Sequence, residues 1–283
     1  MKQDLEYLLD IARQVARLGA ERISDIYRQY LSGQNIDIRE KSKDDPVTAA
    51  DMAANQIITQ RLSSIFPNHA VLTEEDPGTW GETGSEWVWM IDPLDGTRDF
   101  IKANGEFVTM VGLTRAGEPT IGVVVEPGTG LELYACKGMG AYRGWLSQGD
   151  KSTRVKMSDT ADLKHLRIVV SRSHRDPKVD TFIQLLAIRD EIPSGSVGRK
   201  VAMVISGEAD IYVHPSGGTK LWDTCACEAI VSEAGGVLLS GTGEPISYLR
   251  SSGDFENRYG LLVCSPNILD KVIWASKKAW GLI

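Results

Sequence analysis

The stretch WVWMIDPLDGTRDFI, residues 87–101, places acidic side chains at the end of an apolar run. Trp87–Ile91 lacks the alternation of a half-exposed strand, so we expect a strand that is buried on both faces. Asp92 then lies where this strand ends. In sheets covered by helices, ligands bind just outside such strand ends. The stretch therefore predicts a buried strand that delivers a carboxylate to a ligand site.

The residues after Asp92 extend this site. We expect Pro93 to set a turn and Asp95 to precede a short helix, where the N–H groups of Gly96 and Thr97 would face an anion. Acids beside a bound anion need a cation, because two like charges about 4 Å apart repel by about 4 kcal/mol at an effective dielectric constant of 20. Oxygen donors without nearby His or Cys favour Mg²⁺ over zinc and admit Mn²⁺. The alternative is structural, since Asp is also a common helix-cap and turn residue.

Two further segments carry acids at comparable positions. LTEED (72–76) ends an apolar strand in Glu74 and Glu75, and LWDTCACEAIVSEAGG (221–236) places Asp223 at a helix start. Each alone could be a cap or a solvent-exposed acid. Whether these acids join those of residues 87–101 in one site is left open by the residues alone, and the order of the three segments matches a known arrangement described below.

Composition narrows the function classes. The chain has 283 residues, 42% apolar and 24% charged, with a net charge of −7. A groove for polymeric nucleic acid needs clustered Lys and Arg, which are missing here, whereas a small anionic substrate stays possible. No run of about 18 apolar residues predicts a membrane span, and the acids in MKQDLEYLLD do not fit a signal peptide, so we expect a cytoplasmic protein. Four scattered cysteines predict free thiols.

Two lobes are expected from the rhythm of the chain. Residues 1–160 should form an α+β lobe that carries most of the metal ligands, with helices over an antiparallel-leaning sheet. Residues 161–283 alternate strands and helices and should form a smaller α/β lobe carrying Asp223. Residues 144–153 are expected to be an exposed connection. The predicted helices are 3–30, 48–65, 177–188, 199–206, 223–234 and 266–279.

DPLDGTRDF, with TEED upstream and WDTCACEAIVSEAGG downstream, resembles the lithium-sensitive, magnesium-dependent phosphomonoesterases of the inositol monophosphatase superfamily. The resemblance covers nearly the whole chain, beginning at DPVTAAD (45–51). It implies a layered αβαβα sandwich of the sugar phosphatase type. It also implies two or three Mg²⁺ ions, a small phosphate ester as substrate, inhibition by lithium, and a monomer or homodimer.

The resemblance assigns the site residues by position. Glu74, Asp92 and the Leu94 carbonyl would hold one ion, and Asp92, Asp95 and Asp223 a second. Asp51, Thr97 and Glu74 would draw the proton from a metal-activated water, while Gly96 and Thr97 bind the phosphate. Asp51 could equally close a helix-capping box begun by Thr48. Glu75 would not contact the ion directly.

The continuation RDFIK (98–102), with SRSHRD (171–176) and SVGRK (196–200), is similar to the 3'(2'),5'-bisphosphate nucleotidases. This implies hydrolysis of the 3'-phosphate of adenosine 3',5'-bisphosphate to AMP and a place in sulfur metabolism. Substrate contacts are expected from His174, Lys200 and Asp223, and Arg172, Arg175 and Lys220 are further candidates for the second phosphate.

Three alternatives stay open. An inositol monophosphatase or broad sugar phosphatase would share every metal ligand. A non-catalytic metal-binding module would keep the fold. Each substrate-side cation could also be an ordinary surface charge or, for His174, a structural histidine. Gly218 and Cys227 depart from the usual family residues beside the substrate, which leaves the fine specificity open.

Overall fold

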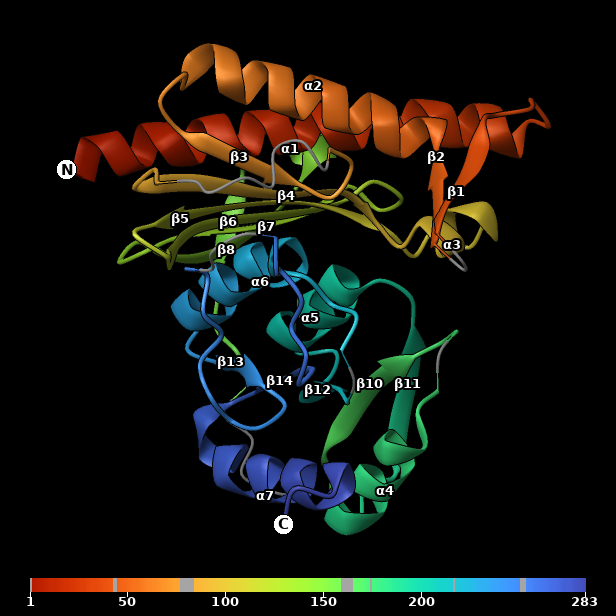
Figure 1. Ribbon diagram of the computed structural model, residues 1–283, viewed down its shortest axis with the longest axis vertical. Helices are drawn as coiled ribbons and strands as arrows, with labels where there is room; N and C mark the ends of the chain where they lie inside the picture. Colours follow the sequence, from red (N-terminus) through yellow and green to blue (C-terminus); the bar gives the residue numbers. More distant parts are fainter. Residues whose placement is uncertain are drawn as a thin grey trace.

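The computed structural model describes residues 2–42, 45–76, 84–158, 165–173, 175–215, 217–249 and 253–283. Five layers alternate along the longest axis of the molecule, two of them sheets and three of them helical (Figure 1). The αβαβα order predicted from the sequence is therefore confirmed. The boundary expected at residues 160 and 161 lies outside the described residues. None of the helices in the described ranges is long and apolar enough to cross a membrane.

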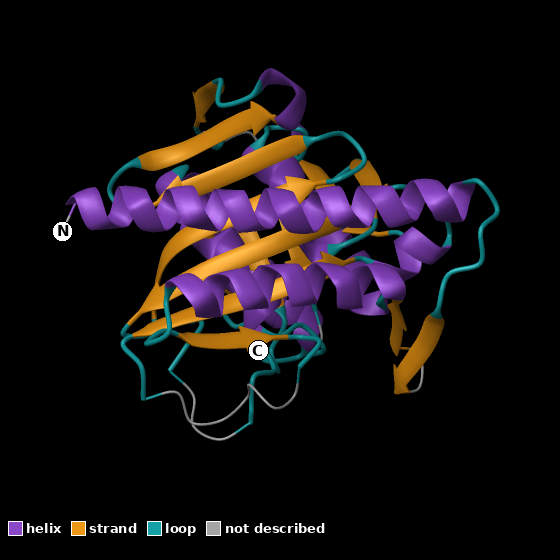
Figure 2. Ribbon diagram, turned by 90° about the horizontal axis from the view of Figure 1, so that it is seen from above, coloured by secondary structure: helices purple, strands orange, loops and turns teal. Residues whose placement is uncertain are grey.

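Two long helices form the first layer. α1 (Lys2–Leu31) and α2 (Ala49–Ile65) lie side by side across the outer face of the first sheet (Figure 2). Their apolar residues recur at the three- and four-residue spacing of a buried helix face, as predicted. Leu8, Val15 and Ile58 are buried there in a core shared with the sheet.

A seven-stranded sheet forms the second layer. Its strand order is β3-β4-β5-β6-β7-β8-β9, with β3 and β4 parallel and the other pairs antiparallel. The strands are β3 (Ala70–Thr73), β4 (Trp87–Asp95), β5 (Val108–Arg115), β6 (Glu118–Glu126), β7 (Leu131–Cys136), β8 (Gly140–Trp145) and β9 (Ser152–Val155).

Two expectations for this sheet were wrong. Residues 144–153 are not a plain exposed connection, because they contain the end of β8, the short 3-10 helix η2 (Leu146–Gln148) and the start of β9. Pro93 does not end the strand in a turn, because β4 continues to Asp95. The strand accommodates Pro93 in a register shift between Asp92 and Asp95, the kind of irregularity where a residue without an N–H fits a sheet.

The other sheet has five strands in the order β11-β10-β12-β14-β13, and β10 lies parallel to both its neighbours. The sequence analysis missed β11, whose segment Asp190–Ser194 has a proline and two acids. The strands of this sheet and the helices between and after them are, in chain order, β10 (Arg167–Ser171), α4 (Pro177–Leu186), β11 (Asp190–Ser194), α5 (Val197–Ile205), β12 (Ile211–His214), α6 (Leu221–Glu233), β13 (Val237–Ser240), β14 (Leu261–Cys264), η4 (Pro266–Ile268) and α7 (Leu269–Trp280). The helices α4 and α7 form the fifth layer below this sheet (Figure 1).

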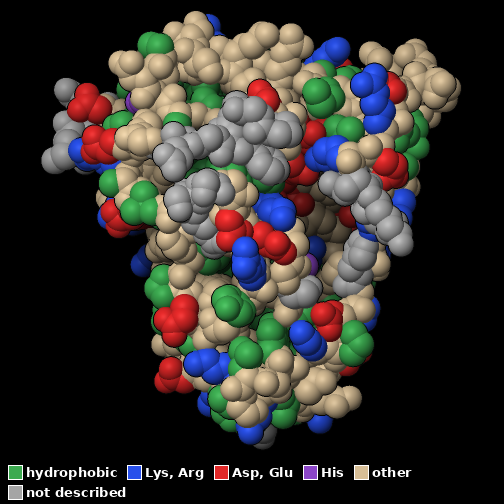
Figure 3. All heavy atoms as spheres, viewed as in Figure 1, with side chains coloured by type: hydrophobic (Ala, Val, Ile, Leu, Met, Phe, Trp, Pro, Cys, Tyr) green, Lys and Arg blue, Asp and Glu red, His purple; other side chains and the backbone are tan. Residues whose placement is uncertain are grey.

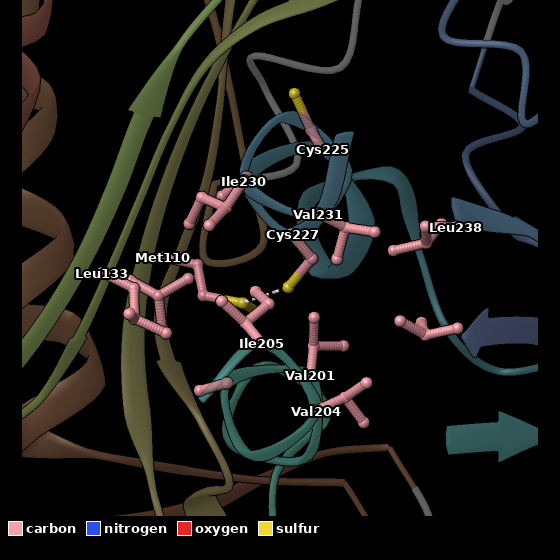
Figure 4. Close-up of a cluster of buried hydrophobic side chains, with 14 of the residues drawn as sticks. Met110, Leu133, Val201, Val204, Ile205, Cys225, Cys227, Ile230, Val231 and Leu238 are labelled. Carbon is pink, nitrogen blue, oxygen red and sulfur yellow. Dashed lines mark hydrogen bonds between the residues drawn. The ribbon is translucent and has the colours of Figure 1, made fainter. Parts of the chain in front are cut away.

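The central layer consists of α5 and α6, which lie between the two sheets (Figure 1). α6 approaches β6 so closely that a Cβ on Gly122 would lie 2.1 Å from the Ala226 carbonyl oxygen. Only glycine fits at such a contact. Figure 4 shows the apolar cluster in which residues of α5 and α6 meet. In this cluster the Cys227 Sγ lies 3.7 Å from the Met110 Sδ. All four cysteines are free and buried, as predicted.

A small hairpin, β1 (Ile38–Ser42) and β2 (Asp45–Thr48), precedes α2 and was not predicted. Its segment is rich in charged residues and has little strand propensity. The hairpin lies beside α3 (Thr97–Ile101), the helix predicted after Asp95 (Figure 1). It therefore forms one wall of the region to which the acidic motifs converge.

Candidate active site

Three carboxylates from distant parts of the chain meet in one place. Oxygens of Glu74, Asp92 and Asp223 all lie within 4.8 Å of one another. Glu74 follows β3 and Asp92 belongs to β4, and the parallel pairing of Thr73 with Ile91 brings both acids to the same edge. Asp223 comes from the first turn of α6. The structure thus brings together acids of all three predicted motifs.

The irregular end of β4 shapes the backbone around this cluster. The Leu94 N–H donates to the Asp92 Oδ1 over 3.0 Å, and the Leu94 side chain is buried. The Leu94 carbonyl oxygen lies 3.2 Å from the Thr97 hydroxyl. Gly96 then turns the chain into α3 with a φ of 104°, a conformation that favours glycine. A Cβ there would also lie 2.9 Å from the Glu106 carbonyl oxygen.

Asp51 joins the start of α2 to the start of α3. Its Oδ2 accepts hydrogen bonds from the Thr48 N–H at 2.8 Å and from the Thr48 hydroxyl at 2.5 Å. Its Oδ1 accepts the Thr97 hydroxyl at 2.9 Å. The capping box and the contact with Thr97, which the sequence offered as alternatives, are both present. Burial raises the pKa of Asp51 to about 6, against the lowering effect of these hydrogen bonds.

Asp95 is held from the opposite side of the site. Its Oδ2 accepts hydrogen bonds from the Ser196 hydroxyl at 2.5 Å and from the Gly198 N–H at 2.6 Å. Ser196 is the residue before α5, and Gly198 lies in the first turn of that helix. Ser196 was not predicted as a site residue, because a serine before a helix is usually only a cap, and it also accepts the Arg199 N–H in that role at 3.0 Å.

Lys41 is a second residue that the sequence analysis missed. From β1 its Nζ reaches the Glu74 Oε1 at 2.6 Å and the Glu75 Oε1 at 3.0 Å. Burial and the nearby Glu74 raise the pKa of Glu75 to about 7, while Lys41 lowers it. Glu75 does not belong to the cluster of Glu74, Asp92 and Asp223. An isolated lysine in an unpredicted hairpin gave no sequence signal for this contact.

The electrostatics of the cluster call for a cation. Burial raises the pKa values of Asp92, Asp95 and Asp223, and the neighbouring carboxylates raise them further. The donors are all oxygens, which fits a hard ion such as Mg²⁺. The Lys41 ammonium already supplies one positive charge next to Glu74. In Figure 3, acidic side chains lie in a hollow on the right of the molecule, with basic ones near its edge.

The acids line a cleft of about 530 Å³. Lys200 is 4% exposed in this cleft, with its Nζ 5.2 Å from the centre of the Tyr212 ring. Burial lowers the pKa of Lys200 to about 8, although Asp95 and Asp99 favour its charged form. Further lining residues include Gly96, Thr97, Ser171, Ser173, His214 and Gly218.

The other predicted substrate contacts are placed differently. His174 lies outside the described residues. Arg172 forms a bidentate pair with Glu106, with distances of 2.7 and 2.8 Å. Arg175 is bound by Asp180 and Glu191, and Lys220 lies 3.9 Å from Glu256. Cys227 lies in the apolar cluster rather than in the cleft lining. Among the predicted cations within the described ranges, Lys200 has the position best suited to a bound phosphate.

Comparisons with known proteins identify relatives of this chain. Residues 4–276 match the inositol monophosphatase family. The chain is 33% identical over 243 residues to the 3'(2'),5'-bisphosphate nucleotidase CysQ of Escherichia coli O157:H7, which covers 85% of this chain and 94% of that protein. It is 30% identical over 245 residues to the protein of the same name from Aggregatibacter actinomycetemcomitans, with coverage of 86% and 87%. The extragenic suppressor protein suhB of Bartonella henselae shares the fold, with a TM-score of 0.81, 23% identity, and coverage of 96% and 99%.

Proposed function

The chain belongs to the inositol monophosphatase family, and from this premise we propose that it is a Mg²⁺-dependent 3'(2'),5'-bisphosphate nucleotidase. The reaction would remove the 3'-phosphate of adenosine 3',5'-bisphosphate and yield AMP and phosphate. The observation that carries the proposal is the meeting of Glu74, Asp92 and Asp223 within 4.8 Å in a chain that is 33% identical to a bisphosphate nucleotidase.

Family members use divalent metals such as Mg²⁺, and the acidic cluster fits such ions. We propose that Glu74, Asp92 and the Leu94 carbonyl hold one ion, and that Asp92, Asp95 and Asp223 hold another. When bound, the ions would supply a polarised water and neutralise the charge that develops on the phosphate. The buried carboxylates support this assignment, because their raised pKa values show that the bare cluster disfavours ionisation.

The residues around the ions would move the proton and hold the phosphate. Asp51 would act as general base through the Thr97 hydroxyl, which donates to its Oδ1. A pKa of about 6 suits a base that works near neutral pH. Glu74 would take part on the other side of the water. The backbone N–H groups of Gly96 and Thr97 would receive the phosphate oxygens at the start of α3.

Substrate choice would depend on the second phosphate. Lys200 is the proposed partner, because it is buried in the cleft close enough to Asp95 and Asp99 for their charges to act on it. Arg172 and Arg175 already bind carboxylates of this chain, so we do not assign the second phosphate to them. A desolvated lysine interacts strongly with a phosphate, because little water screens the pair.

Phosphate release from a substrate panel tests the proposal. Adenosine 3',5'-bisphosphate, phosphoadenylyl sulfate and myo-inositol 1-phosphate should be compared with Mg²⁺ and with EDTA. We expect the bisphosphate to have the highest kcat/KM, no turnover in EDTA, and inhibition by LiCl. Faster hydrolysis of myo-inositol 1-phosphate would refute the nucleotidase assignment and favour the inositol or sugar phosphatase alternative. No metal-dependent release from any of the three would refute both the nucleotidase and the inositol monophosphatase assignments.

A further inference from the structure

Glu106 connects the two sides of the cleft, although no predicted role falls on it. It precedes β5, and its carboxylate receives the Arg172 guanidinium at 2.7 and 2.8 Å. The Glu106 Oε2, which accepts the Arg172 Nε–H at 2.8 Å, also accepts the Gly195 N–H at 2.7 Å. Arg172 in turn donates to the Pro193 carbonyl at 2.8 Å. One carboxylate from the segment before β5 thus fixes the residues that follow β10 and β11 in the other sheet.

The segment that Glu106 holds leads directly to Asp95. Gly195 is followed by Ser196, whose φ of 56° is uncommon for a residue with a side chain. Such a conformation persists only where the surroundings determine it. The Ser196 hydroxyl and the Gly198 N–H both donate to the Asp95 Oδ2. The position of this one oxygen, and hence the direction of the other, depends on the segment after Gly195.

We propose that Glu106 is a positioning residue for metal binding. It anchors the Gly195 N–H, which keeps Ser196 in its positive-φ conformation, and Ser196 then orients Asp95 with one oxygen bound and the other directed to the cation. Partners of this kind, behind the ligands of a metal, change metal affinity by about 10- to 100-fold when removed. The inference rests on the proposed role of Asp95 as a metal ligand.

If Glu106 had a purely structural role, its loss would lower the stability of the fold without a specific effect on Mg²⁺ binding. Its partner Arg172 is 43% exposed, whereas the Glu106 side chain is 14% exposed. Ion pairs with an exposed partner contribute little to stability, so thermal unfolding must measure what remains of a structural contribution. A control pair exists at the other end of β5, where Arg115 is also 43% exposed and pairs at 2.7 Å with Glu86, which is 55% exposed. That pair lies far along the strand from Asp95.

The experiment measures Mg²⁺ binding by calorimetry for wild type, Glu106→Ala, Glu106→Gln, Ser196→Ala, the double variant Glu106→Ala/Ser196→Ala, and the control Glu86→Ala. We expect Glu106→Ala to weaken Mg²⁺ binding about ten-fold or more and Glu86→Ala to leave it unchanged. Glu106→Gln should recover part of the affinity, since its amide oxygen still accepts the Gly195 N–H. The double variant should be no weaker than the weaker single variant, because both act on Asp95 by one route.

Thermal unfolding in EDTA keeps these outcomes interpretable, because it separates loss of the fold from loss of the ion. Unchanged Mg²⁺ affinity in a folded Glu106→Ala, a loss equal to that of Glu86→Ala, or additive effects in the double variant would overturn the inference. The failure of the proposed function is a separate result. If wild type binds Mg²⁺ in a Glu106-dependent way and yet releases no phosphate from the bisphosphate, the positioning role stands and the nucleotidase assignment falls.

Discussion

Asp92→Asn is expected to abolish turnover while it stabilises the metal-free protein. Asp92 is 2% exposed, and burial together with the charges of Glu74, Asp95 and Asp223 raises its pKa well above the usual value. Asparagine has nearly the same shape, and its amide oxygen can still accept the Leu94 N–H, which lies 3.0 Å away in the wild-type chain. The substitution therefore removes the ionisable group without creating a cavity.

The magnitude follows from proton linkage. A carboxyl group that stays protonated in the folded chain at pH 7, and ionises near pH 3.9 in the unfolded chain, destabilises the fold by at most about 4 kcal/mol. Because the folded state binds more protons, this penalty is absent below about pH 4 and grows as the pH rises toward 7. At about 2 °C for each kcal/mol, Asp92→Asn should raise the Tm of the metal-free protein by up to about 8 °C at pH 7 and by much less at pH 4.

Thermal unfolding in EDTA at both pH values, with phosphate release in Mg²⁺, tests both halves of this prediction. Asp10→Asn on the exposed face of α1 is the control and should change stability by no more than about 0.5 kcal/mol. Saturating Mg²⁺ should reverse the order, because the ion stabilises the form that binds it. A metal-free Asp92→Asn that is less stable than wild type at pH 7, or one that still turns over, would refute the reasoning.

Three further predictions concern the residues around the cluster. Thr97→Val should lower kcat about 100-fold, because it removes the hydroxyl that donates to Asp51, and Thr97→Ser should restore most of the rate; equal rates for Val and Ser would contradict this. Lys41→Ala should strengthen Mg²⁺ binding about two- to five-fold in calorimetry, because its ammonium competes for Glu74; weaker binding would contradict it. The acid limb of the kcat/KM profile should have its midpoint at or below pH 6, since the pKa of Asp51 without a metal is about 6. Cations held by Glu74 and its neighbours would offset the Glu74 charge that raises the pKa of Asp51, so the limb should move to lower pH as Mg²⁺ rises, and a limb independent of Mg²⁺ would count against the proposed base.

The sequence predicted the layers of the fold because its periodicities are strong. The helix spacing of residues 3–30 and the apolar runs of β4, β5 and β6 correspond to elements that are buried by the core. β1 and β11 were missed because their residues are mostly exposed and charged, so tertiary pairing rather than local preference makes them strands.

The site residues that belong to a recognisable motif could be predicted from the sequence. The residues outside the motifs that contact them could not. Asp92 and Asp95 could be predicted from residues 87–101, because acidic side chains there follow an apolar run that is expected to be buried. Lys41 and Glu106 gave no such signal, because a lysine or glutamate in a polar segment is ordinary until the fold brings it to a partner. Resemblance to a family supplied the assembly of the three motifs, which spacing alone would have left open.

Asp51 is the acidic member of the capping box that Thr48 begins at α2, and its other oxygen holds the Thr97 hydroxyl. This position of a capping box is usually open to exchange, since Glu and Gln also serve there. Here a substitution that strengthened the hydrogen bonds at the start of the helix would disturb the Thr97 hydroxyl beside the acidic cluster. One that changed the pKa of the carboxylate would weaken the hydrogen bonds that stabilise the helix start. Stability and turnover therefore draw on the same atoms at this position, which restricts both natural drift and laboratory thermostabilisation at the start of α2.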